Sequence, residues 1–389
     1  ATDLPLGSYC LQEIHTDAAY LLSDQRYPVT FAYGGQETAL VSITANEGEP
    51  IENHLIYGSV SGTKRNEDGD ALGGALIGIF RTGTEEFTAE TAIQTVTSAD
   101  DGNFSFEKVP YGTWLIREIE SPAGFVLSEE IIPVAIGSAG EIVEIEIVND
   151  FITGCIELTK VDRDYPENRL TGAAFEVYAD LDGDGSLTET DSLLGTMTEY
   201  DKGVYRMENL RYGSYLVKET KAPEGFYLDT GVYAVSITED GQAVLVENEA
   251  GKGFLNAMQH GSLQIKKTSE DGTLAGFRFQ VTGTDILGNP FSAQYATDEN
   301  GEIWITNLRI GSYTISELSG EENQRYVLPE NQTVTIAANT ISTVTFYNEL
   351  RDVPDTGDRS TGAIYVAAMA VFLAGAAACF VQSKRRKQK

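Results

Sequence analysis

Residues Gly213 to Glu219 read Gly-Ser-Tyr-Leu-Val-Lys-Glu, and three related heptapeptides occur elsewhere in the chain. The shared pattern is a glycine, an aromatic residue two positions later, an aliphatic residue at the fifth position and a glutamate at the seventh. The other copies begin at Gly7, Gly112 and Gly311. Their glutamates are 105, 101 and 98 residues apart, so the chain repeats a unit of about one hundred residues, the size of a small domain.

Each heptapeptide has the two-residue period of a β-strand. In the copy at Gly213, one face carries Tyr215, Val217 and Glu219, which are the aromatic, the aliphatic and the acidic residue. The glutamate is therefore predicted to point into the core. A buried carboxylate is costly unless it is paired or protonated, so a glutamate at this position in every copy requires a partner. The inward glutamates are Glu13, Glu118, Glu219 and Glu317.

Two further elements recur around the glutamate strand. An earlier strand carries an inward lysine, and the strand that ends each unit carries an inward asparagine. At each internal junction the asparagine lies 11 residues before the next lysine, and a glycine (Gly58, Gly154 or Gly261) follows the asparagine by five residues. This constant spacing predicts rigidly stacked modules rather than a flexible linker. The lysines are Lys64, Lys160 and Lys267, and the asparagines are Asn53, Asn149, Asn256 and Asn348.

The first unit differs from the other three. It has the glutamate Glu13 and the asparagine Asn53 but no lysine strand, so these two residues are predicted to form an orphan half-site. We therefore expect the chain to begin inside a domain. The N-terminus also lacks an initiator methionine and the basic and apolar segments that are typical of a signal peptide.

A lysine, a glutamate and an asparagine that are buried together can form a covalent bond. Burial favours the neutral amine, which is a nucleophile, and the protonated carboxyl group. The protonated glutamate can polarise the asparagine carbonyl and pass a proton to the departing ammonia. The alternative is a hydrogen-bonded polar cluster without a bond. The predicted isopeptide bonds are Lys64–Asn149, Lys160–Asn256 and Lys267–Asn348, promoted by Glu118, Glu219 and Glu317.

The segment from Tyr215 to Phe226, Tyr-Leu-Val-Lys-Glu-Thr-Lys-Ala-Pro-Glu-Gly-Phe, closely resembles the E-box of pilin domains. Together with the repeats, it makes residues 1–350 similar to the collagen-binding B-type and SpaA-like domains of Gram-positive surface proteins. This resemblance implies an all-β fold of tandem immunoglobulin-like, prealbumin-like β-sandwiches. It also implies self-formed isopeptide bonds, and no enzyme activity beyond that autocatalytic, single-turnover reaction.

Residues 180–191 read Asp-Leu-Asp-Gly-Asp-Gly-Ser-Leu-Thr-Glu-Thr-Asp and match the template of a calcium-binding loop. Carboxylates at the first, third and fifth positions, a glycine at the sixth and a carbonyl at the seventh can surround a hard cation. The alternative is a solvated acidic hairpin loop. No other cofactor is required. The predicted calcium ligands are Asp180, Asp182, Asp184, Ser186 and Asp191.

The C-terminal segment combines three features in a fixed order: a Val-Pro-Asp-Thr-Gly motif, an uncharged stretch at 363–381 that nearly spans a bilayer, and a basic tail. This order resembles the cell-wall sorting signal of Gram-positive surface proteins, although valine stands where leucine is usual. The resemblance implies that a sortase cleaves after the threonine and joins it to peptidoglycan. A permanent membrane anchor is the alternative. The motif residues are Val353, Pro354, Asp355, Thr356 and Gly357.

Composition excludes several other classes of protein. A formal net charge of −32 argues against a nucleic-acid partner, whose phosphates would be repelled. The three cysteines are far apart and the three histidines are scattered, so a disulfide framework and a zinc site are not expected. The predicted organisation is the C-terminal part of a truncated sandwich at 1–57, complete sandwiches at 58–153, 154–260 (with the calcium-loop-like insertion) and 261–350, the sorting motif at 351–357, and a transmembrane helix with a basic cytoplasmic tail at 358–389.

These features predict a cell-wall-anchored adhesin or pilin-like protein on the surface of a Gram-positive bacterium, retained in the membrane only until it is sorted. The modules would form a stalk for an upstream head that binds a host matrix protein or glycan. One alternative is the C-terminal spacer and anchor of an extracellular enzyme whose catalytic domain lies upstream. Another is that the modules themselves bind a matrix protein or glycan.

Overall fold

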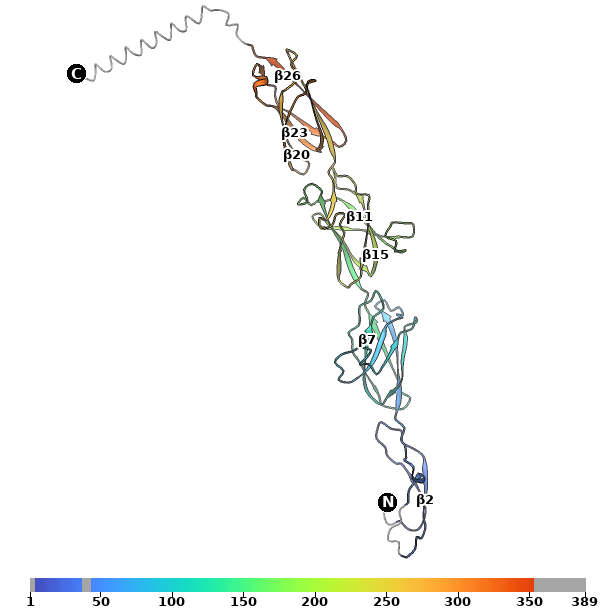
Figure 1. Ribbon diagram of the computed structural model, residues 1–389. Coiled ribbons are helices and arrows are strands. Elements are labelled where there is room, and N and C mark those ends of the chain that lie inside the picture. Colours follow the sequence, from blue (N-terminus) through green and yellow to red (C-terminus); the bar gives the residue numbers. More distant parts are fainter. Residues whose placement is uncertain (1–3, 37–42, 353–389) are drawn as a thin grey trace, which may run out of the picture. The chain divides into compact units, whose positions relative to one another are not determined.

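The computed structural model describes residues 4–36 and 43–352 and is built from β-strands (Figure 1). Within these residues the only helical elements are two 3-10 turns, η1 (Asn46–Gly48) and η2 (Glu321–Asn323). The predicted all-β architecture of tandem β-sandwiches is confirmed. The chain divides into two compact units, one of residues 1–223 and 228–256, and the other of residues 224–227 and the chain from residue 257.

Residues 58–153, called module 1 below, form a sandwich of a three-stranded and a four-stranded sheet. In the first sheet β3 is antiparallel to β6 and parallel to β9. The second sheet has the order β5-β4-β7-β8, and all its pairs are antiparallel. The strands are β3 (Tyr57–Asn66), β4 (Leu76–Arg81), β5 (Gln94–Thr97), β6 (Asn103–Pro110), β7 (Gly112–Glu120), β8 (Ile132–Ile136) and β9 (Ile142–Asn149).

Residues 154–260, module 2, repeat this topology with two changes. An additional strand, β13, pairs antiparallel with β14 at the edge of the first sheet. The last strand is split into β17 and β18, which both pair in parallel with β10, and residues 246–253 connect them. The second sheet has the order β12-β11-β15-β16. The strands are β10 (Thr153–Asp162), β11 (Ala174–Ala179), β12 (Ser192–Thr196), β13 (Thr198–Asp201), β14 (Val204–Arg211), β15 (Gly213–Lys221), β16 (Val232–Ile237), β17 (Gln242–Leu245) and β18 (Phe254–Asn256).

Residues 261–350, module 3, have a continuous last strand, β26, which is parallel to the first strand, β19. The two sheets have the orders β22-β19-β26-β24 and β21-β20-β23-β25. The strands are β19 (His260–Ser269), β20 (Arg278–Asp285), β21 (Pro290–Ala296), β22 (Glu302–Arg309), β23 (Gly311–Glu317), β24 (Tyr326–Val327), β25 (Gln332–Ile336) and β26 (Ile341–Leu350).

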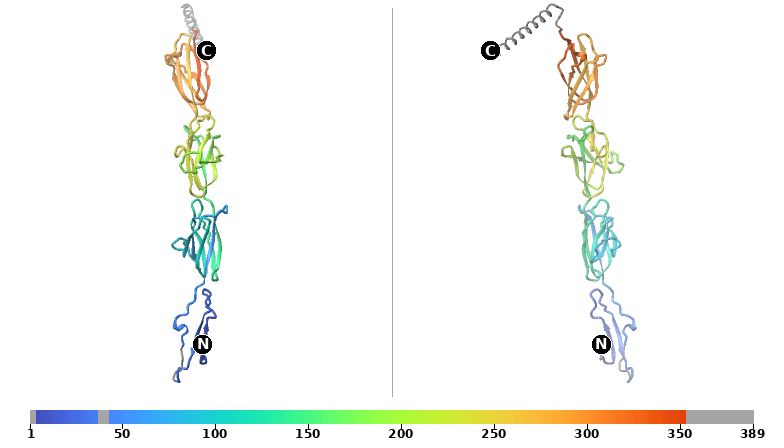
Figure 2. Two further views of the ribbon diagram at one scale, coloured as in Figure 1. Left: turned by 90° about the vertical axis from the view of Figure 1, so that its right-hand side faces the viewer. Right: turned by 60° about the vertical axis from the view of Figure 1, so that its left-hand side comes forward.

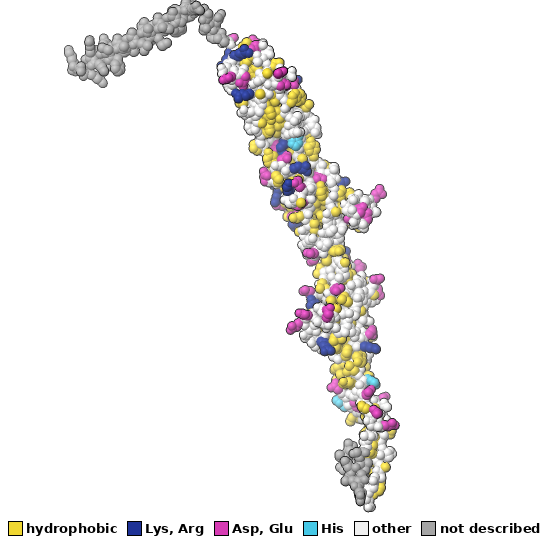
Figure 3. Space-filling model, viewed as in Figure 1, with side chains coloured by type: hydrophobic (Ala, Val, Ile, Leu, Met, Phe, Trp, Pro, Cys, Tyr) yellow, Lys and Arg dark blue, Asp and Glu magenta, His cyan; other side chains and the backbone are white. Residues whose placement is uncertain are grey.

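Each module buries its own hydrophobic core between its two sheets, and Figure 2 shows each module as a separate bundle of strands. The alternation along each strand explains this arrangement, because residues two apart project to the same side. In β3, for example, every second residue from Gly58 to Asn66 is buried. Acidic side chains are spread over the visible surface of the modules (Figure 3).

A glycine recurs near the start of each first strand because another part of the backbone approaches closely there. A Cβ atom at Gly154 would lie 2.5 Å from the carbonyl oxygen of Gln242. A Cβ atom at Gly58 would lie 2.6 Å from the carbonyl oxygen of Glu141, and Gly261 is confined in the same way. The close contact between the first strand and the start of the last strand therefore explains the glycine that follows each junction asparagine.

The N-terminal unit, residues 4–57, contains one antiparallel strand pair, β1 (Gly7–Gln12) and β2 (Arg26–Phe31). The predicted inward face of β1 is only partly covered. Tyr9 packs edge-on against Phe31, with ring centroids 5.6 Å apart, whereas the side chain of Leu11 is 45% exposed. Glu13, which the repeat places on the inward face, is only partly buried in this unit.

Candidate functional site

In every module the register of the first and last strands brings the lysine close to the asparagine. Lys64 lies opposite Ile147 in the β3–β9 pair, two residues before Asn149. The β10–β18 and β19–β26 pairs have the same offset. Because residues two apart face the same side, the lysine and the asparagine project into the same core. The lysines are Lys64, Lys160 and Lys267, opposite Ile147, Phe254 and Phe346.

The three modules bury all nine of these polar side chains. The lysines are at most 1% exposed, the asparagines at most 2% and the glutamates at most 8%. Residues of these types are rarely so buried without partners, because water can no longer solvate their charged or polar groups. The buried set comprises Lys64, Glu118, Asn149, Lys160, Glu219, Asn256, Lys267, Glu317 and Asn348.

In module 1 the three side chains are in direct contact. The Lys64 amine donates a short hydrogen bond to Asn149 Oδ1 and lies 3.6 Å from Glu118 Oε1. Asn149 Nδ2 donates to Glu118 Oε1 at 2.9 Å, and the amide of Ser128 donates to Glu118 Oε2 at 2.8 Å. Burial lowers the pKa of Lys64, although Glu118 partly offsets this effect. The amine is therefore placed beside the group that it would attack.

In module 2 the carboxyl group of Glu219 faces the asparagine amide. Asn256 Nδ2 lies 2.9 Å from both oxygens of Glu219, and the backbone amide of Asp229 donates to Oε2 at 2.7 Å. The Lys160 amine donates to the carbonyl oxygen of Phe254 at 2.8 Å and lies 4.0 Å from Glu219 Oε1. Burial lowers the pKa of Lys160 to about 8 and raises the pKa of Glu219.

In module 3 a second asparagine contacts the glutamate. Asn348 Nδ2 donates to Glu317 Oε1 at 2.7 Å, and Asn323 Nδ2 donates to the same oxygen at 3.0 Å. The Lys267 amine donates to the carbonyl oxygen of Thr268 at 2.6 Å, and burial lowers its pKa to about 8. Sequence reasoning missed Asn323, which lies on η2 outside any strand and so gives no periodic signal.

Aromatic rings complete the surroundings of two of the lysines. The Lys160 amine lies 5.1 Å from the ring centroid of Phe254, and the Lys267 amine lies 4.4 Å from that of Phe277. An aromatic face attracts a cation but offers no hydrogen bond. The rings therefore attract the charged amine weakly but do not replace the hydrogen bonds that water would give it.

The orphan half-site of the N-terminal unit repeats the contact between the acid and the amide. Asn53 Nδ2 donates to Glu13 Oε1 at 2.9 Å, and the amide of Ser23 donates to Glu13 Oε2 at 3.1 Å. The hydrogen bonds from Asn53 and Ser23 lower the pKa of Glu13. This direction is opposite to the rise expected for a buried glutamate, because the N-terminal unit does not enclose the carboxylate.

The geometry of the three modules specifies which chemistry the glutamate can perform. In each module a carboxyl oxygen contacts the asparagine Nδ2 atom. The nitrogen is the atom that must leave as ammonia if a lysine attacks Cγ, so the carboxyl group lies where a proton is needed. The Oδ1 atoms of Asn256 and Asn348 have no hydrogen-bond partner among the described residues.

The candidate calcium loop connects β11 and β12. Carboxylate oxygens of Asp180, Asp182 and Asp184 lie within 4.8 Å of one another. Three carboxylates at this separation fit a hard cation that prefers oxygen ligands. Asp191 instead accepts hydrogen bonds from the amides of Leu181 and Thr188. The predicted ligand Ser186 donates its backbone amide to Asp184 at 2.7 Å, which supports the turn.

The predicted sorting motif, Val353, Pro354, Asp355, Thr356 and Gly357, and the apolar stretch at 363–381 lie outside the described residues. Within residues 4–36 and 43–352, no helix has the length and hydrophobicity that a membrane-spanning segment requires.

Comparison with known proteins relates the chain to a family of β-sandwich domains. The model of the SpaA prealbumin-like fold domain matches residues 58–150, 154–250 and 261–350. Among solved structures, the Bacillus anthracis TIE protein is 26% identical with a TM-score of 0.58, over 76% of this chain and 51% of that protein. The chain therefore spans about half the length of that relative.

Two pilins resemble the chain more distantly. The Bacillus cereus major pilin subunit BcpA is 14% identical with a TM-score of 0.35, over 76% of this chain and 99% of the pilin. A streptococcal ancillary pilin is 18% identical with a TM-score of 0.29, over 76% of this chain and all of the pilin. No curated protein matches the chain. Because the family model matches three consecutive segments that make up most of the sequence, the chain belongs to the family of SpaA prealbumin-like fold domains, of which it contains three in tandem.

Proposed function

We propose that this chain is part of the stalk of a Gram-positive cell-surface protein, a pilin-like protein or adhesin, and that each module is locked by a self-formed isopeptide bond. The observation that carries the proposal is the recurrence of one buried arrangement in three modules. In each, a lysine on the first strand lies near an asparagine on the last strand, and the asparagine amide contacts a buried glutamate.

The reaction in module 1 illustrates the chemistry. The neutral Lys64 amine attacks Cγ of Asn149, so that a bond forms between Nζ and Cγ while the bond between Cγ and Nδ2 breaks. Glu118 protonates the departing Nδ2, which leaves as ammonia, and then takes up the proton that the lysine nitrogen loses. Folding supplies the proximity of the amine and the amide, which is worth several kcal/mol of the barrier. No external oxidant, cofactor or energy source is consumed.

The pairs for modules 2 and 3 are Lys160 with Asn256 and Lys267 with Asn348. Lysine pKa values of about 8 support this proposal, because an amine at an ordinary pKa of 10.5 is far more protonated at neutral pH. A hydrogen-bonded cluster without a bond would place the same residues together. The mass of the chain distinguishes the two, because only bond formation removes ammonia.

The sequence of the C-terminal segment supports surface attachment. A sortase would cleave between Thr356 and Gly357 and join Thr356 to peptidoglycan, so that residues 357–389 are removed. Binding of a host matrix protein or glycan would belong to a head outside this sequence. A calcium ion in the loop at 180–191 would stiffen that loop in an environment where the ion is abundant.

Peptide mapping of the full chain tests the proposal. The protein is purified, denatured and digested, and the peptides are identified by mass spectrometry. Three branched peptides are expected, each joining one of the lysines to its asparagine with the loss of one ammonia. Unbranched peptides carrying all three lysines and asparagines unmodified would contradict the proposal.

A further inference from the structure

Module 2 differs from the other modules in the residues that surround its proposed Lys160–Asn256 bond. The residue ten positions after the glutamate is Asp229 in module 2, whereas it is Ser128 in module 1 and Val327 in module 3. The last strand of module 2 is also interrupted, and residues 246–253 connect its two parts. Both differences lie close to Glu219.

Asp229 contacts the acid through its backbone and is itself held through its side chain. Its amide donates to Glu219 Oε2 at 2.7 Å. Its carboxylate accepts hydrogen bonds from the Tyr233 hydroxyl at 3.0 and 3.1 Å, from the amide of Gly231 at 2.7 Å and from Asn248 Nδ2 at 2.7 Å. These donors come from β16, from the turn before it and from the 246–253 connection, so they fix Asp229 from several directions.

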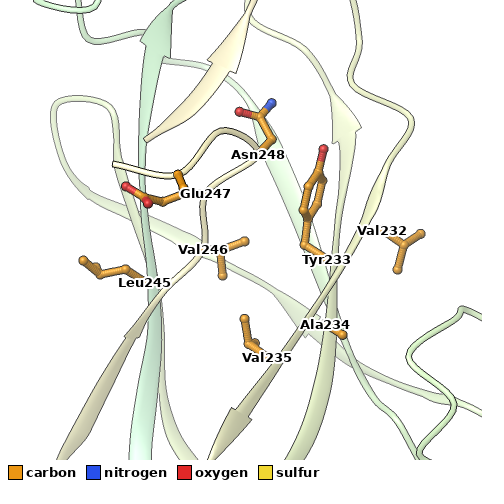
Figure 4. A pocket seen from close by; sticks show the side chains of 9 residues that line it. Val232, Tyr233, Ala234, Val235, Leu245, Val246, Glu247 and Asn248 are labelled. Atoms are coloured by element: carbon orange, nitrogen blue, oxygen red, sulfur yellow. The ribbon is translucent and has the colours of Figure 1, made fainter. Parts of the chain in front are cut away.

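Asn248 extends this network to the residue that precedes the acceptor asparagine. Its Nδ2 atom donates to the carbonyl oxygen of Leu255 at 2.8 Å, and its Oδ1 atom accepts from the amide of Leu255 at 2.7 Å. Asn248 thus pairs with the backbone of Leu255 as a neighbouring strand would. Figure 4 shows Tyr233 and Asn248 at one end of a pocket of about 400 Å³.

The result is a closed ring of contacts that includes the acid and the acceptor asparagine. It runs from Glu219 to Asp229, then to Asn248, Leu255 and Asn256, and returns to Glu219. Each link is a hydrogen bond or a peptide bond. The ring therefore sets the distance between the acid and the acceptor amide from both sides.

We propose that Asp229 is a positioning residue for isopeptide formation in module 2, where it holds Glu219 and, through Asn248, the backbone next to Asn256. This inference rests on the proposed function of the module. Sequence reasoning did not find Asp229, because it lies in a loop. The interruption of the last strand is explained by the same role, since the 246–253 connection delivers Asn248 to the ring.

The charge of Asp229 provides a readout that a purely structural role would not change. Burial raises the pKa of Glu219, the hydrogen bond from the backbone amide of Asp229 lowers it, and the negative charge of the Asp229 carboxylate raises it. Burial lowers the pKa of Lys160, and Asp229 opposes this effect together with Glu219. Lys160 is also influenced by Asp162, which raises its pKa, and by Arg163, which lowers it. Removing the carboxylate of Asp229 should therefore lower the pKa of both reacting groups.

The experiment compares bond formation in four full-length chains: the unmodified sequence, Asp229→Ser, Asp229→Asn and Asn248→Ala. Asp229→Ser introduces the residue that module 1 has at Ser128, so the backbone amide is kept. Each chain is synthesised in a cell-free reaction, samples are denatured at successive times, and the branched peptide of Lys160 and Asn256 is quantified by mass spectrometry at several pH values. The branched peptide of Lys64 and Asn149 in the same molecules is the internal control.

Asp229→Ser and Asn248→Ala are expected to form the Lys160–Asn256 bond about tenfold more slowly, because small displacements of reacting groups cost one or more orders of magnitude in rate. The pH profile should move to lower pH in Asp229→Ser but not in Asn248→Ala, since Asn248→Ala keeps the carboxylate. Asp229→Asn, which keeps an oxygen for Tyr233, should be faster than Asp229→Ser and keep the shifted profile. Because Asp229→Asn changes the side chain least, a recovered rate in this variant shows that the slower reaction of Asp229→Ser is not caused by misfolding.

Equal rates and equal pH profiles in the unmodified chain and in the variants would overturn the inference while leaving the proposed function intact. A loss of rate at both the Lys160–Asn256 and Lys64–Asn149 pairs would also overturn it, since the effect would not be specific to module 2. Absence of the branched peptide from the unmodified chain would overturn the inference and the proposed function together.

Discussion

The Nδ2 atom of Asn256 lies 2.9 Å from each carboxyl oxygen of Glu219, although 37 residues separate the two in sequence. Both side chains are buried, so this contact is made without competition from water. Because Nδ2 is the group that leaves when an amine attacks the asparagine, the glutamate lies at the leaving group. The chemistry of each module should therefore depend on its glutamate.

Glu219→Ala is expected to abolish the bond between Lys160 and Asn256, since no group remains to protonate the leaving nitrogen. The bonds of modules 1 and 3 should be unaffected. Peptide mapping of the full chain measures all three bonds in one sample. Glu239→Ala, at an exposed position of the same module, is the matched control and should retain every bond. Full branching in Glu219→Ala would show that the acid is dispensable.

Adjacent lysines in module 3 provide a second test, because they face opposite sides of β19. Lys267 is buried, whereas Lys266 is partly exposed and lies 3.7 Å from Glu302. Lys267→Ala should lose the cross-link to Asn348 and with it about 4–5 kcal/mol of unfolding free energy by the chain-entropy model. Lys266→Ala should change stability by less than about 1 kcal/mol. Denaturant unfolding measures both, and equal effects would contradict the cross-link.

The rate of bond formation in module 2 should have a bell-shaped dependence on pH. When both Lys160 and Glu219 are protonated, the pair must lose one proton before it can react. In the reactive form of the resulting state, Lys160 is neutral and Glu219 is protonated. Above a pH of about 8, the pKa of Lys160, this proton is lost and the rate falls. Below the raised pKa of Glu219 both groups are protonated and the rate falls again. Timed quenching and peptide mapping across pH 4 to 10 (about the range spanned by these groups) checks this, and a rate that rises steadily with pH would contradict it.

Calcium should stabilise module 2 through the loop at 180–191. An ion that binds only the folded loop raises the melting temperature, and the rise should increase with ion concentration. The double variant Asp182→Ala with Asp184→Ala should lose this response, whereas Glu189→Ala, at an exposed position of the same loop, should keep it. Calorimetry of the full chain with and without millimolar calcium, a range typical of extracellular sites, checks the prediction. An unchanged transition would favour the acidic hairpin loop.

The Val353 to Gly357 motif should be cleaved in a Gram-positive host. Cell-wall digestion without detergent is expected to release the protein with a peptidoglycan fragment on Thr356. Deletion of the motif should leave the chain in the membrane fraction. Recovery of the unmodified protein only by detergent, with residues 384–387 still attached, would favour a permanent membrane anchor instead.

The repeated elements of the fold were predictable because a β-strand has a fixed period. Once Tyr215 and Val217 mark the core face, Glu219 must share it, and the same parity places Lys160 and Asn256 inside. The structure brings these three residues together. The repeat pattern did not predict that the last strand of module 2 is split into two parts.

Loops carry the parts of the site that sequence reasoning missed. Asp229, Asn248 and Asn323 lie outside the regular strands, where the side-chain direction follows from turn geometry rather than from alternation. Asp229 and Asn323 donate hydrogen bonds to Glu219 and Glu317, and Asn248 bonds to Asp229. These contacts depend on how the loops return to the core. For Glu13 the repeat predicted which way the side chain faces but not its pKa. That pKa depends on how completely the surrounding chain encloses the carboxylate.

The parallel pairing of the first and last strands has a mechanical consequence. In module 1 the chain enters at the start of β3 and leaves at the end of β9, and these two strands run side by side in the same direction. Tension on the chain therefore loads their hydrogen bonds in shear, so that many must fail together instead of opening one after another. Antiparallel neighbours joined in the same way would unzip from one end. Resistance to pulling is thus a property of the strand order of this fold, and a covalent link at Lys64 and Asn149 would confine the load to a single strand.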